Sequence, residues 1–566
     1  MIKVEVPWIV KILLRNSNGK VDNVGNFFFD PSDPNNKYTM MQFATFYFRR
    51  PKGVSAGIID NINFNSDSTQ RKRKYRLEVA EKVKHTSKPI GHSLLRLDNN
   101  EADKLAQEAF MCIMRYMGDE NLKRGQTLTD CVYELLMICH QYQPLRDEVY
   151  CQIIRQTTNS KTSKASTSIR GWRLFSILTA YFDCSPVLKP YLFKYLIDMV
   201  NDPRRAYHGT AFICLQNLVK TFKYGGRQFL LSGNEIEAIT MGKTLKRQLY
   251  HLPGGHRKVI NTRSVTVVEE IIQQLCQELN IRSAAEQQEF CLCYILESEG
   301  KIKMLANDEY VMDVCTELEH NQKQYFLLLK RTVWIHPLRL DNARYIDVMF
   351  FQVVPDYIEG LIIASKNGKI SADILDDVAR LGAYLHLADT ERSSCVTTKN
   401  VADLIPKTIY PIRTIDQWVE RINAKLHTMQ QNNINQIDAR AYFLEILEKW
   451  PYFGTTFFVV HNIIDENEQT GECLLAINKH GIKVMNIKNR EEILKIALTE
   501  IMSTNRYSTQ HGIFLDIKIG NQYKNKSITI HTEQGIEISR LLGQYIYVGS
   551  ENRAFISGIE QQEFRI

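Results

Sequence analysis

The side chains best suited to bind a partner are five cations within six residues. They are Arg71, Lys72, Arg73, Lys74 and Arg76, and they end a stretch that begins with polar residues near residue 62. Clustered cations attract polyanionic partners and speed their encounter, and added salt weakens this effect. We predict a mobile surface loop at residues 62–76 that binds an acidic protein surface such as tubulin. The alternative is a solvated loop without a partner.

Two thinner groups of cations extend this prediction along the chain. Apart from Tyr75, aromatic side chains are not interleaved with the cations, and no zinc-finger or RNP motif occurs, so nucleic acid is not an expected partner. The additional predicted contacts are Lys161, Lys164, Lys220, Lys223 and Arg227.

Residue types used in catalysis are common in the chain, but they do not form catalytic patterns. The sequence has no GxxxxGK[ST] loop, no HExxH and no kinase motif set. Asp376 and Asp377 are adjacent in a helical pattern, where neighbouring side chains diverge and make a poor acid–base pair. The 12 cysteines lack zinc-type spacing, which indicates free thiols in a reducing compartment. We therefore expect a cytoplasmic protein that is not an enzyme and needs no metal or cofactor.

The elements that must present the cations are helices. In residues 102–117, Leu105, Ala109, Phe110 and Ile113 fall on one face of a helix. Five more runs have the same character, and together they predict a helical bundle or superhelix. These runs are Leu128–His140, Arg146–Gln156, Trp172–Ala180, Leu188–Val200 and Ala211–Phe222.

The residue pattern changes after residue 242. Strand, turn, strand, helix and two more strands succeed one another up to residue 333, which suggests a ubiquitin-like unit. Amphipathic helices then return, and from residue 452 several strands precede a last helix at 534–547, as in a pleckstrin-homology fold. The expected fold class is multidomain α+β. We place a leader at 1–40, a helical domain at 41–242, and three lobes at 243–333 (ubiquitin-like), 334–451 (helical) and 452–566 (pleckstrin-like).

Charge is distributed unevenly over these parts. The chain of 566 residues has 71 Lys and Arg and 63 Asp and Glu, a net charge of +8. Residues 41–240 carry ten more basic than acidic residues, whereas residues 241–566 carry three fewer. The 44% apolar composition excludes a disordered or fibrous chain, and no apolar run is long enough to span a membrane. A basic binding surface is therefore expected on the helical domain.

Three strings resemble the myosin-tail-homology domain of unconventional myosins, in the order found there. Leu145–Thr157 resembles its signature helix, Arg170–Phe175 the next helix, and Lys220–Phe229 with Glu235–Ile239 its end. The chain beyond residue 242 resembles a FERM domain, whose lobes are ubiquitin-like, acyl-CoA-binding-protein-like and pleckstrin-homology-like. That order matches the one obtained from the residue patterns.

Further strings resemble the distal tail of class XV myosins, with class VII as the next candidate. The resemblance covers residues 41–566, and the motor head, lever and SH3 module are not in this sequence, so we expect a tail fragment or a separately expressed tail. The strings are Trp334–Leu338, Gln352–Leu361, Tyr452–Phe458 and Glu533–Ile538.

The resemblance implies a cytoskeleton-associated tail of an actin-based motor that works at the tips of filopodia or similar protrusions. The helical domain would bind microtubules through basic faces, the FERM lobes would bind cargo proteins, and actin would be bound only by the motor head. Two alternatives remain: a membrane-proximal FERM adaptor for acidic lipid and receptor tails, and the tail of a kinesin-like protein.

A groove in the pleckstrin-like lobe is the first of two predicted peptide sites. An edge strand at 513–519 and the closing helix would leave room for an added strand or an amphipathic helix. The alternative is that the same apolar side chains fill the core. The predicted groove residues are Ile513, Leu515, Ile517, Ile538, Leu541, Leu542 and Tyr545.

The chain end is the second predicted peptide site. Phe564, Arg565 and Ile566 have the hydrophobic-x-hydrophobic form of a PDZ ligand, provided that Ile566 carries a free carboxylate. Class XV tails that end in such a motif have a hydroxyl residue where this chain has Phe564. The expected partner is a PDZ scaffold of undetermined identity.

Overall fold

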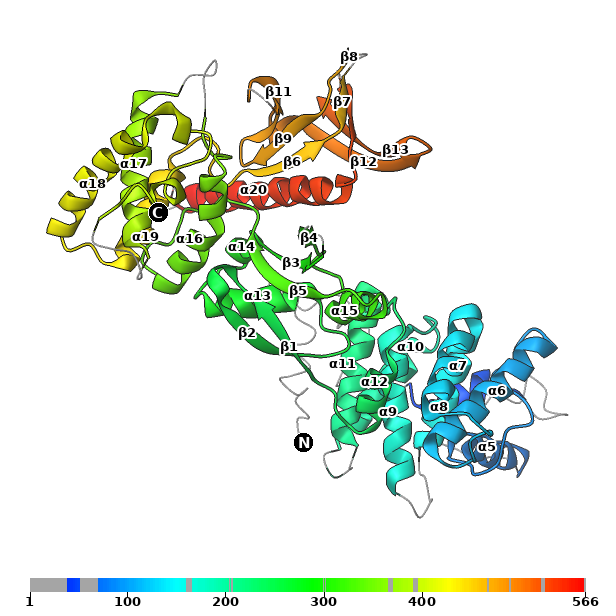
Figure 1. Cartoon of the computed structure of the whole chain (residues 1–566). Helices are drawn as coiled ribbons and strands as arrows, with labels where there is room; N and C mark the ends of the chain where they lie inside the picture. Colours follow the sequence, from blue (N-terminus) through cyan, green and yellow to red (C-terminus); the bar gives the residue numbers. More distant parts are fainter. Residues whose placement is uncertain are drawn as a thin grey trace. The chain divides into compact units, whose positions relative to one another are not determined.

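The computed structural model forms two compact units (Figure 1). The first unit contains the chain up to Lys246 together with Asn261–Val267 and Asp308–Gln322, and the second contains the remainder. Short segments of the predicted ubiquitin-like lobe therefore belong to the helical unit. The structure describes residues 38–50, 70–158, 165–202, 204, 207–298, 300, 302–364, 370–389, 395–465, 468–487, 490–520 and 525–563.

Helices form the first unit, including all six predicted from the sequence. Local signals set their ends: the Asn99 side chain accepts the Ala102 N–H at the start of one helix, and Gly118, with φ of 90°, ends it. The helices are α3 (Met40–Tyr47), α5 (Gln70–Val83), α6 (Asn100–Met117), α7 (Leu128–Gln141), α8 (Pro144–Thr157), α9 (Ala165–Tyr181), α10 (Lys189–Val200), α11 (His208–Tyr224), α12 (Gly233–Thr240) and α15 (Val311–His320).

One apolar core holds these helices together. Trp172 of α9 is fully buried and stacks on Tyr195 of α10, with ring centroids 5.9 Å apart, and on Tyr207 at 5.1 Å. The same core includes Val267 and Tyr310, which lie in the two segments that the first unit takes from beyond residue 246. The core is thus shared by residues that are far apart in the sequence.

The second unit begins with a five-stranded sheet in the order β2-β1-β5-β3-β4, as expected of a ubiquitin-like lobe. Strands β1 and β5 are parallel, with Tyr250 opposite Leu327, whereas β3 is antiparallel to β5 and β4. The elements are β1 (Lys246–His251), β2 (Arg257–Thr262), α13 (Val268–Glu278), α14 (Ala284–Gln287), β3 (Phe290–Leu296), β4 (Ile302–Met304) and β5 (Tyr325–Arg331).

A helical lobe comes next, in the part of the chain where the sequence predicts amphipathic helices. Helices α17 and α18 pack on each other, and α19 packs on α16 and α17. Phe443 is the aromatic centre, because its ring meets Phe350 at 5.1 Å and Tyr357 at 5.3 Å. The helices are α16 (Ala343–Ile358), α17 (Ala372–Leu387), α18 (Ile415–Gln431) and α19 (Gln436–Glu448).

Two sheets and a long helix, α20 (Gly535–Glu563), form the last lobe. The sheets have the orders β11-β10-β9-β6 and β12-β13-β14-β7-β8. The strands are β6 (Thr456–Val460), β7 (Asn462–Asp465), β8 (Glu468–Gln469), β9 (Cys473–Asn478), β10 (Gly481–Asn486), β11 (Glu492–Ile496), β12 (Ile501–Thr509), β13 (Gly512–Gly520) and β14 (Asn525–His531).

The predicted fold class is confirmed: a helical domain is followed by FERM-like lobes of helices and sheets. The short strands β4, β7 and β8 were not predicted. Strands β11 and β12 were not predicted either, because their residues are mostly exposed and show no alternation of apolar and polar types. Helix α20 begins near the predicted residue but extends to Glu563. The first 37 residues of the predicted leader lie outside the described residues, whereas Met40 and Phe43 are buried in the helical core.

Candidate functional site

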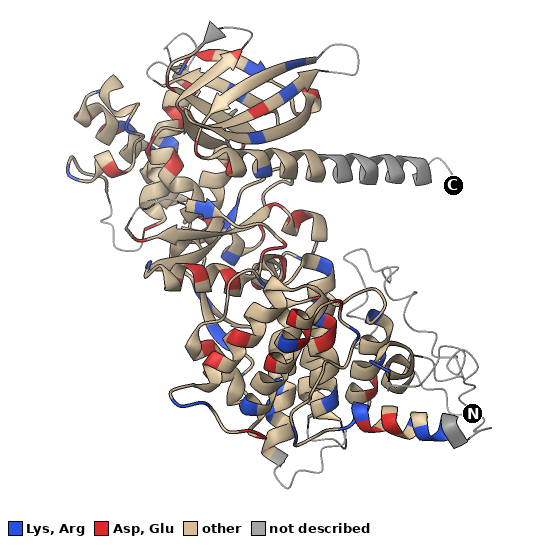
Figure 2. Cartoon of the chain, turned by 90° about the vertical axis from the view of Figure 1, so that its right-hand side faces the viewer, with Lys and Arg blue, Asp and Glu red and all other residues tan. Residues whose placement is uncertain are grey.

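The densest cation cluster lies on a helix, so the prediction of a loop that extends to Arg76 is wrong. Tyr75 and Val79, four residues apart on α5, are buried, and the Tyr75 hydroxyl donates to the Thr45 carbonyl at 2.9 Å. Because these two residues turn inward, Arg73 and Lys74 are exposed on the other side, where Figure 2 shows a blue stretch of this helix. Residues 62–69 lie outside the described part of the chain.

The other predicted cations have diverse environments. Arg76 is half-buried, and the Lys220 amine donates to the Val265 carbonyl at 2.9 Å. Lys223 is exposed, with its amine 4.7 Å from the centre of the Tyr224 ring. The structure does not describe Lys161, Lys164 or the side chains of Arg71 and Lys72.

Arg227 is a structural residue, so its predicted role as a surface contact is wrong. Its side chain has 0% exposure, and its guanidinium donates to Asp313 at 2.8 Å and to Glu235 at 2.7 Å. Asp313 also accepts the Gln228 N–H at 2.8 Å. This buried ion network joins α11–α12 and α15 within the first unit, and the Arg227 guanidinium is not available to a partner.

The predicted groove residues fill the core of the last lobe, so their proposed role as a peptide surface is wrong. Strand β13 is paired on both sides, with β12 and β14, and is therefore not an edge. Ile513 is half-buried. Alternate residues of β13 face the same apolar interior as one side of α20, and this interior is closed. The fully buried members are Leu515, Ile517, Ile538, Leu541, Leu542 and Tyr545.

The edge strand beside α20 is instead β12. No strand pairs with its outer side among the described residues, and most of its side chains are exposed, Met502 by 50%. The hydroxyls of Thr504 and Ser539 are 2.6 Å apart, which ties β12 to α20. The sequence held one signal for this strand, the β-favouring Thr504, Tyr507 and Thr509, but no apolar alternation accompanied it.

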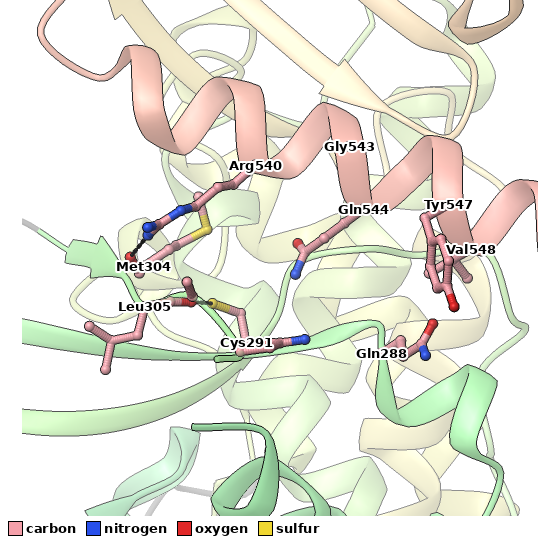
Figure 3. Close-up of a pocket in the computed structure, with 11 residues that line it drawn as sticks. Gln288, Cys291, Met304, Leu305, Arg540, Gly543, Gln544, Tyr547 and Val548 are labelled. Carbon is pink, nitrogen blue, oxygen red and sulfur yellow. Dashed lines mark hydrogen bonds between the residues drawn. The ribbon is translucent and has the colours of Figure 1, made fainter. Parts of the chain in front are cut away.

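A pocket of about 340 Å³ lies along the other flank of α20 (Figure 3). It is lined by Arg540, Gln544 and Tyr547 of the helix and by residues of β3 and the segment after β4. The Arg540 guanidinium donates to the Met304 carbonyl at 3.0 Å. Gln288 Oε1, which also lines the pocket, is a buried acceptor with no donor in the described structure. The second unit thus offers a strand edge and a pocket on opposite flanks of one helix.

Reactive and metal-binding groups do not converge in the described residues. No group of three or more His, Cys, Asp and Glu side chains there could hold a metal ion. Every described cysteine except Cys395 is buried, and burial raises the pKa of the Cys139 thiol to about 12, which makes it a poor nucleophile. Helices long and apolar enough to cross a membrane are likewise not found in the described ranges.

Four family models match successive parts of the chain. They are the MyTH4 domain at residues 132–238, the Ras association (RalGDS/AF-6) domain at 250–332, the FERM central domain at 335–458 and the PTB domain (IRS-1 type) at 457–548.

Two relatives match most of the chain. The chain is 30% identical to human unconventional myosin-XV over 512 residues and 30% identical to human unconventional myosin-XVB over 464 residues, matches that cover 90% and 82% of this chain. It spans 14% of the length of each of these relatives.

A solved structure shares the fold. It is the C-terminal MyTH4-FERM domain of human myosin 7b, in complex with the harmonin-a PDZ3 domain, with a TM-score of 0.62 and 19% identity over 90% of this chain and 96% of that chain. The helical unit, the three lobes that follow it and the similarity to class XV tails all indicate the same family. The chain therefore belongs to the MyTH4–FERM tails of unconventional myosins.

Proposed function

We propose that this chain is a non-catalytic cargo-binding segment of a motor tail, and that its last lobe takes a cargo peptide as an added strand on β12. The free edge of β12 beside α20 carries this proposal. A peptide backbone can pair with unpaired N–H and C=O groups of an edge strand, while pockets along the strand select its side chains. The match of residues 457–548 to a PTB domain supports the same mode.

A bulky side chain introduced on the flank of α20 that faces β12 tests this site. Peptides are first selected from a displayed random library on the whole chain, and their affinity is then measured on variants. We expect Ser539→Trp to weaken binding about tenfold or more, because Ser539 contacts β12 through Thr504. The matched control is Gln544→Trp, which places the same indole ring on the opposite flank.

Amide exchange gives a second readout of the strand edge. Binding should slow hydrogen exchange in residues 501–509, because added-strand pairing protects amides on the outer side of β12. Peptides that bind Ser539→Trp as well as the wild type and leave β12 exchange unchanged would contradict the proposal. Loss of binding in Gln544→Trp alone would move the peptide site to the pocket of Figure 3.

The basic helix supports a second activity, the binding of acidic cytoskeletal partners such as microtubules. Arg73 and Lys74 project from a helix anchored by Tyr75 and Val79, so the cations are held on a structured surface rather than on a loop. Since exposed charges are screened over a Debye length of about 10 Å at 0.1 M salt, co-pelleting with microtubules should fall steeply between about 50 and about 200 mM salt.

Alanine substitutions test whether α5 is the face that binds microtubules. Replacement of Arg71, Lys72, Arg73, Lys74 and Arg76 should abolish most co-pelleting at low salt. The control variant replaces Lys123 and Arg124, two exposed cations between α6 and α7, and its co-pelleting at low salt should differ little from that of the wild type. Unchanged co-pelleting of the five-residue variant, or equal loss in the control, would exclude α5 as the binding face.

A PDZ scaffold is the third proposed partner, through Phe564, Arg565 and Ile566. These residues lie outside the described structure, and support comes from the myosin 7b tail that was solved with a harmonin PDZ domain. Deletion of the three residues should remove PDZ domains from a pull-down and leave library peptides bound.

The motor of the parent protein would supply the ATPase activity, and a fluorescently tagged full-length protein should collect at the tips of filopodia or similar protrusions.

A further inference from the structure

A row of aromatic rings crosses the sheet β12-β13-β14-β7 of the last lobe. It runs from Tyr507 on β12 through Phe514 on β13 and His531 on β14 to His461, which directly precedes β7. The strand register places Tyr507 opposite Phe514, and Phe514 opposite His531. Leu515, the neighbour of Phe514, is buried in the core with α20, so the rings lie on the other face of the sheet. We call these four residues the aromatic ladder.

The rings are spaced like the strands that carry them. The centroids of Tyr507 and Phe514 are 5.7 Å apart, those of Phe514 and His531 4.7 Å, and those of His531 and His461 4.9 Å. In the first two pairs the ring planes are nearly parallel, at 18° and 19°. Neighbouring strands of a sheet lie about 4.8 Å apart. A further strand would therefore carry a ring of its own to stacking distance from the end of the ladder.

Close packing and hydrogen bonds fix the rings of the ladder. Gly512 on β13 has φ of +129°, and a Cβ atom there would lie 2.4 Å from Nε2 of His531, so the position of this imidazole requires glycine. The Tyr507 hydroxyl donates to Oδ1 of Asp516, which also accepts from the Thr529 hydroxyl at 2.6 Å. Side chains that are held before binding lose little conformational freedom when a partner packs on them.

The ladder ends at the edge of the sheet where we propose that a peptide adds. Strand β12 is the outermost strand, and Tyr507 is 37% exposed, whereas Phe514 on the next strand is half-buried. Aromatic pairs across neighbouring strands stabilise a sheet, and Tyr507 has such a cross-strand partner on one side only among the described residues. The side of Tyr507 away from Phe514 is thus the place where an added strand would extend the ladder.

We propose that the peptide taken up by β12 carries an aromatic residue directly opposite Tyr507, and that this residue becomes the next rung of the aromatic ladder. This rests on the strand addition proposed above and names the chemistry of the peptide. Tyrosine, phenylalanine or tryptophan fits, because each presents a flat apolar face to the Tyr507 ring.

The aromatic preference is confined to one position of the peptide. Side chains alternate between the two faces of a sheet, so the residues next to the aromatic one point toward α20, where Thr504 and Ser539 present hydroxyls. The following residues on the ladder face lie opposite Asn505 and Thr509, which carry no ring. Tyr507 is therefore the residue of β12 that selects an aromatic side chain.

The peptides selected on the whole chain from the random library give the first test. Among those that slow hydrogen exchange in residues 501–509, we expect one position to be enriched in tyrosine, phenylalanine or tryptophan. Replacement of that peptide residue by alanine should weaken binding to the wild-type chain about fivefold, because it removes one aromatic pair across the strand edge.

Variants of the chain show whether the peptide ring pairs with Tyr507. Tyr507→Thr keeps a strand-forming residue and removes the ring, so the same peptide change should then weaken binding less than about twofold. Tyr507→Phe keeps the ring and should retain the fivefold loss seen with the wild type. The matched control is Met502→Thr, which removes another exposed apolar side chain of β12 outside the ladder and should also retain that loss.

The outcomes separate the aromatic rung from strand addition itself. Aromatic enrichment, with a peptide effect that disappears in Tyr507→Thr alone, supports the proposal. Peptides that protect β12 without an aromatic preference, or a peptide effect that persists in Tyr507→Thr, overturn the rung and leave strand addition intact. Disappearance of the effect in Met502→Thr or Tyr507→Phe also overturns it, because both variants keep every ring of the ladder.

Selected peptides that all leave exchange in residues 501–509 unchanged would overturn both proposals. Tyr507→Ile, which keeps an apolar strand-forming side chain, repeats the test if Tyr507→Thr lowers the melting temperature.

Discussion

The guanidinium of Arg227 lies between the carboxylates of Asp313 and Glu235 and is closed off from solvent. Removal of one member of such a pair leaves an uncompensated buried charge, which typically costs about 3–5 kcal/mol. We therefore expect Arg227→Ala to lower the free energy of unfolding of the helical unit by about that amount, measured by urea denaturation followed by tryptophan fluorescence.

Lys223 gives the matched control, because the sequence places it in the same basic group but its side chain is exposed. Lys223→Ala should change the free energy of unfolding by less than about 1 kcal/mol. Equal stability of the two variants would contradict the structural role of Arg227.

Asp103 is the residue with the clearest dependence on acid. Partial burial acts to raise its pKa, but hydrogen bonds from His92 and Ser93 and the charge of Arg49 hold that pKa at about 2. The unfolded value is about 3.9, so the ionised carboxylate stabilises the fold above that pH. This contribution is lost as pH falls from about 4 towards about 2.

Asp103→Asn should therefore destabilise the chain at neutral pH and make little difference near pH 2. Urea denaturation at a series of pH values measures this. If the difference in free energy of unfolding between variant and wild type stays constant from neutral pH to pH 2, the carboxylate charge is not the cause of the destabilisation.

At the scale of elements, α20 has one face in the core and two flanks directed outward. Leu542 lies on the core face and is 0% exposed. Leu542→Ala should lower the free energy of unfolding by about 2–5 kcal/mol through lost burial and a cavity. Peptide affinity, measured below the melting temperature of the variant, should change little. A Leu542→Ala variant that stays folded but loses peptide binding would instead support the peptide groove predicted from the sequence.

Helix α5 shows how an element exposes residues on one side of a structured surface. A period of four between Tyr75 and Val79 is enough to anchor a helix, and Arg73 and Lys74 are then exposed on its other side. This short apolar signal lies within a strongly polar run, which explains why the sequence favoured a loop. Strand β12 was missed for a similar reason, since an edge strand needs no apolar alternation.

At the scale of the whole molecule, the helical domain is completed by residues beyond its predicted end at 242. Asp313 accepts from Arg227, and the Tyr310 hydroxyl donates to the Gly225 carbonyl at 2.7 Å. A fragment ending at residue 242 lacks both partners. Amide exchange in residues 225–240 should therefore be faster in that fragment than in the full chain, when both are followed by mass spectrometry.

The full chain with Asp313→Ala is the control for this comparison, since it removes one contact and leaves the rest of the chain in place. The rate of amide exchange in residues 225–240 of this variant should lie between the rates of the fragment and the wild type. Equal exchange in all three proteins would mean that the helical domain is complete by residue 242.

The sequence by itself determined the order of the domains and most of the elements. Apolar residues recur with the helical period in α6 to α11 and with buried-strand character in β9 and β13, and this pattern depends only on local chain geometry. The family strings, from Leu145–Thr157 to Glu533–Ile538, added the identity of the domains. Charge counting placed the excess of basic over acidic residues within residues 41–240.

Only the tertiary structure decided which individual side chains are available to a partner. Arg227 and Lys223 are four residues apart and have the same charge, yet one is buried between carboxylates supplied in part from residue 313. Leu515 and Leu542 looked equally suitable for a groove or a core, and packing of α20 against the sheets buries both in one core. Burial and strand order depend on contacts between residues distant in the chain, and sequence periodicity carries no information about those contacts.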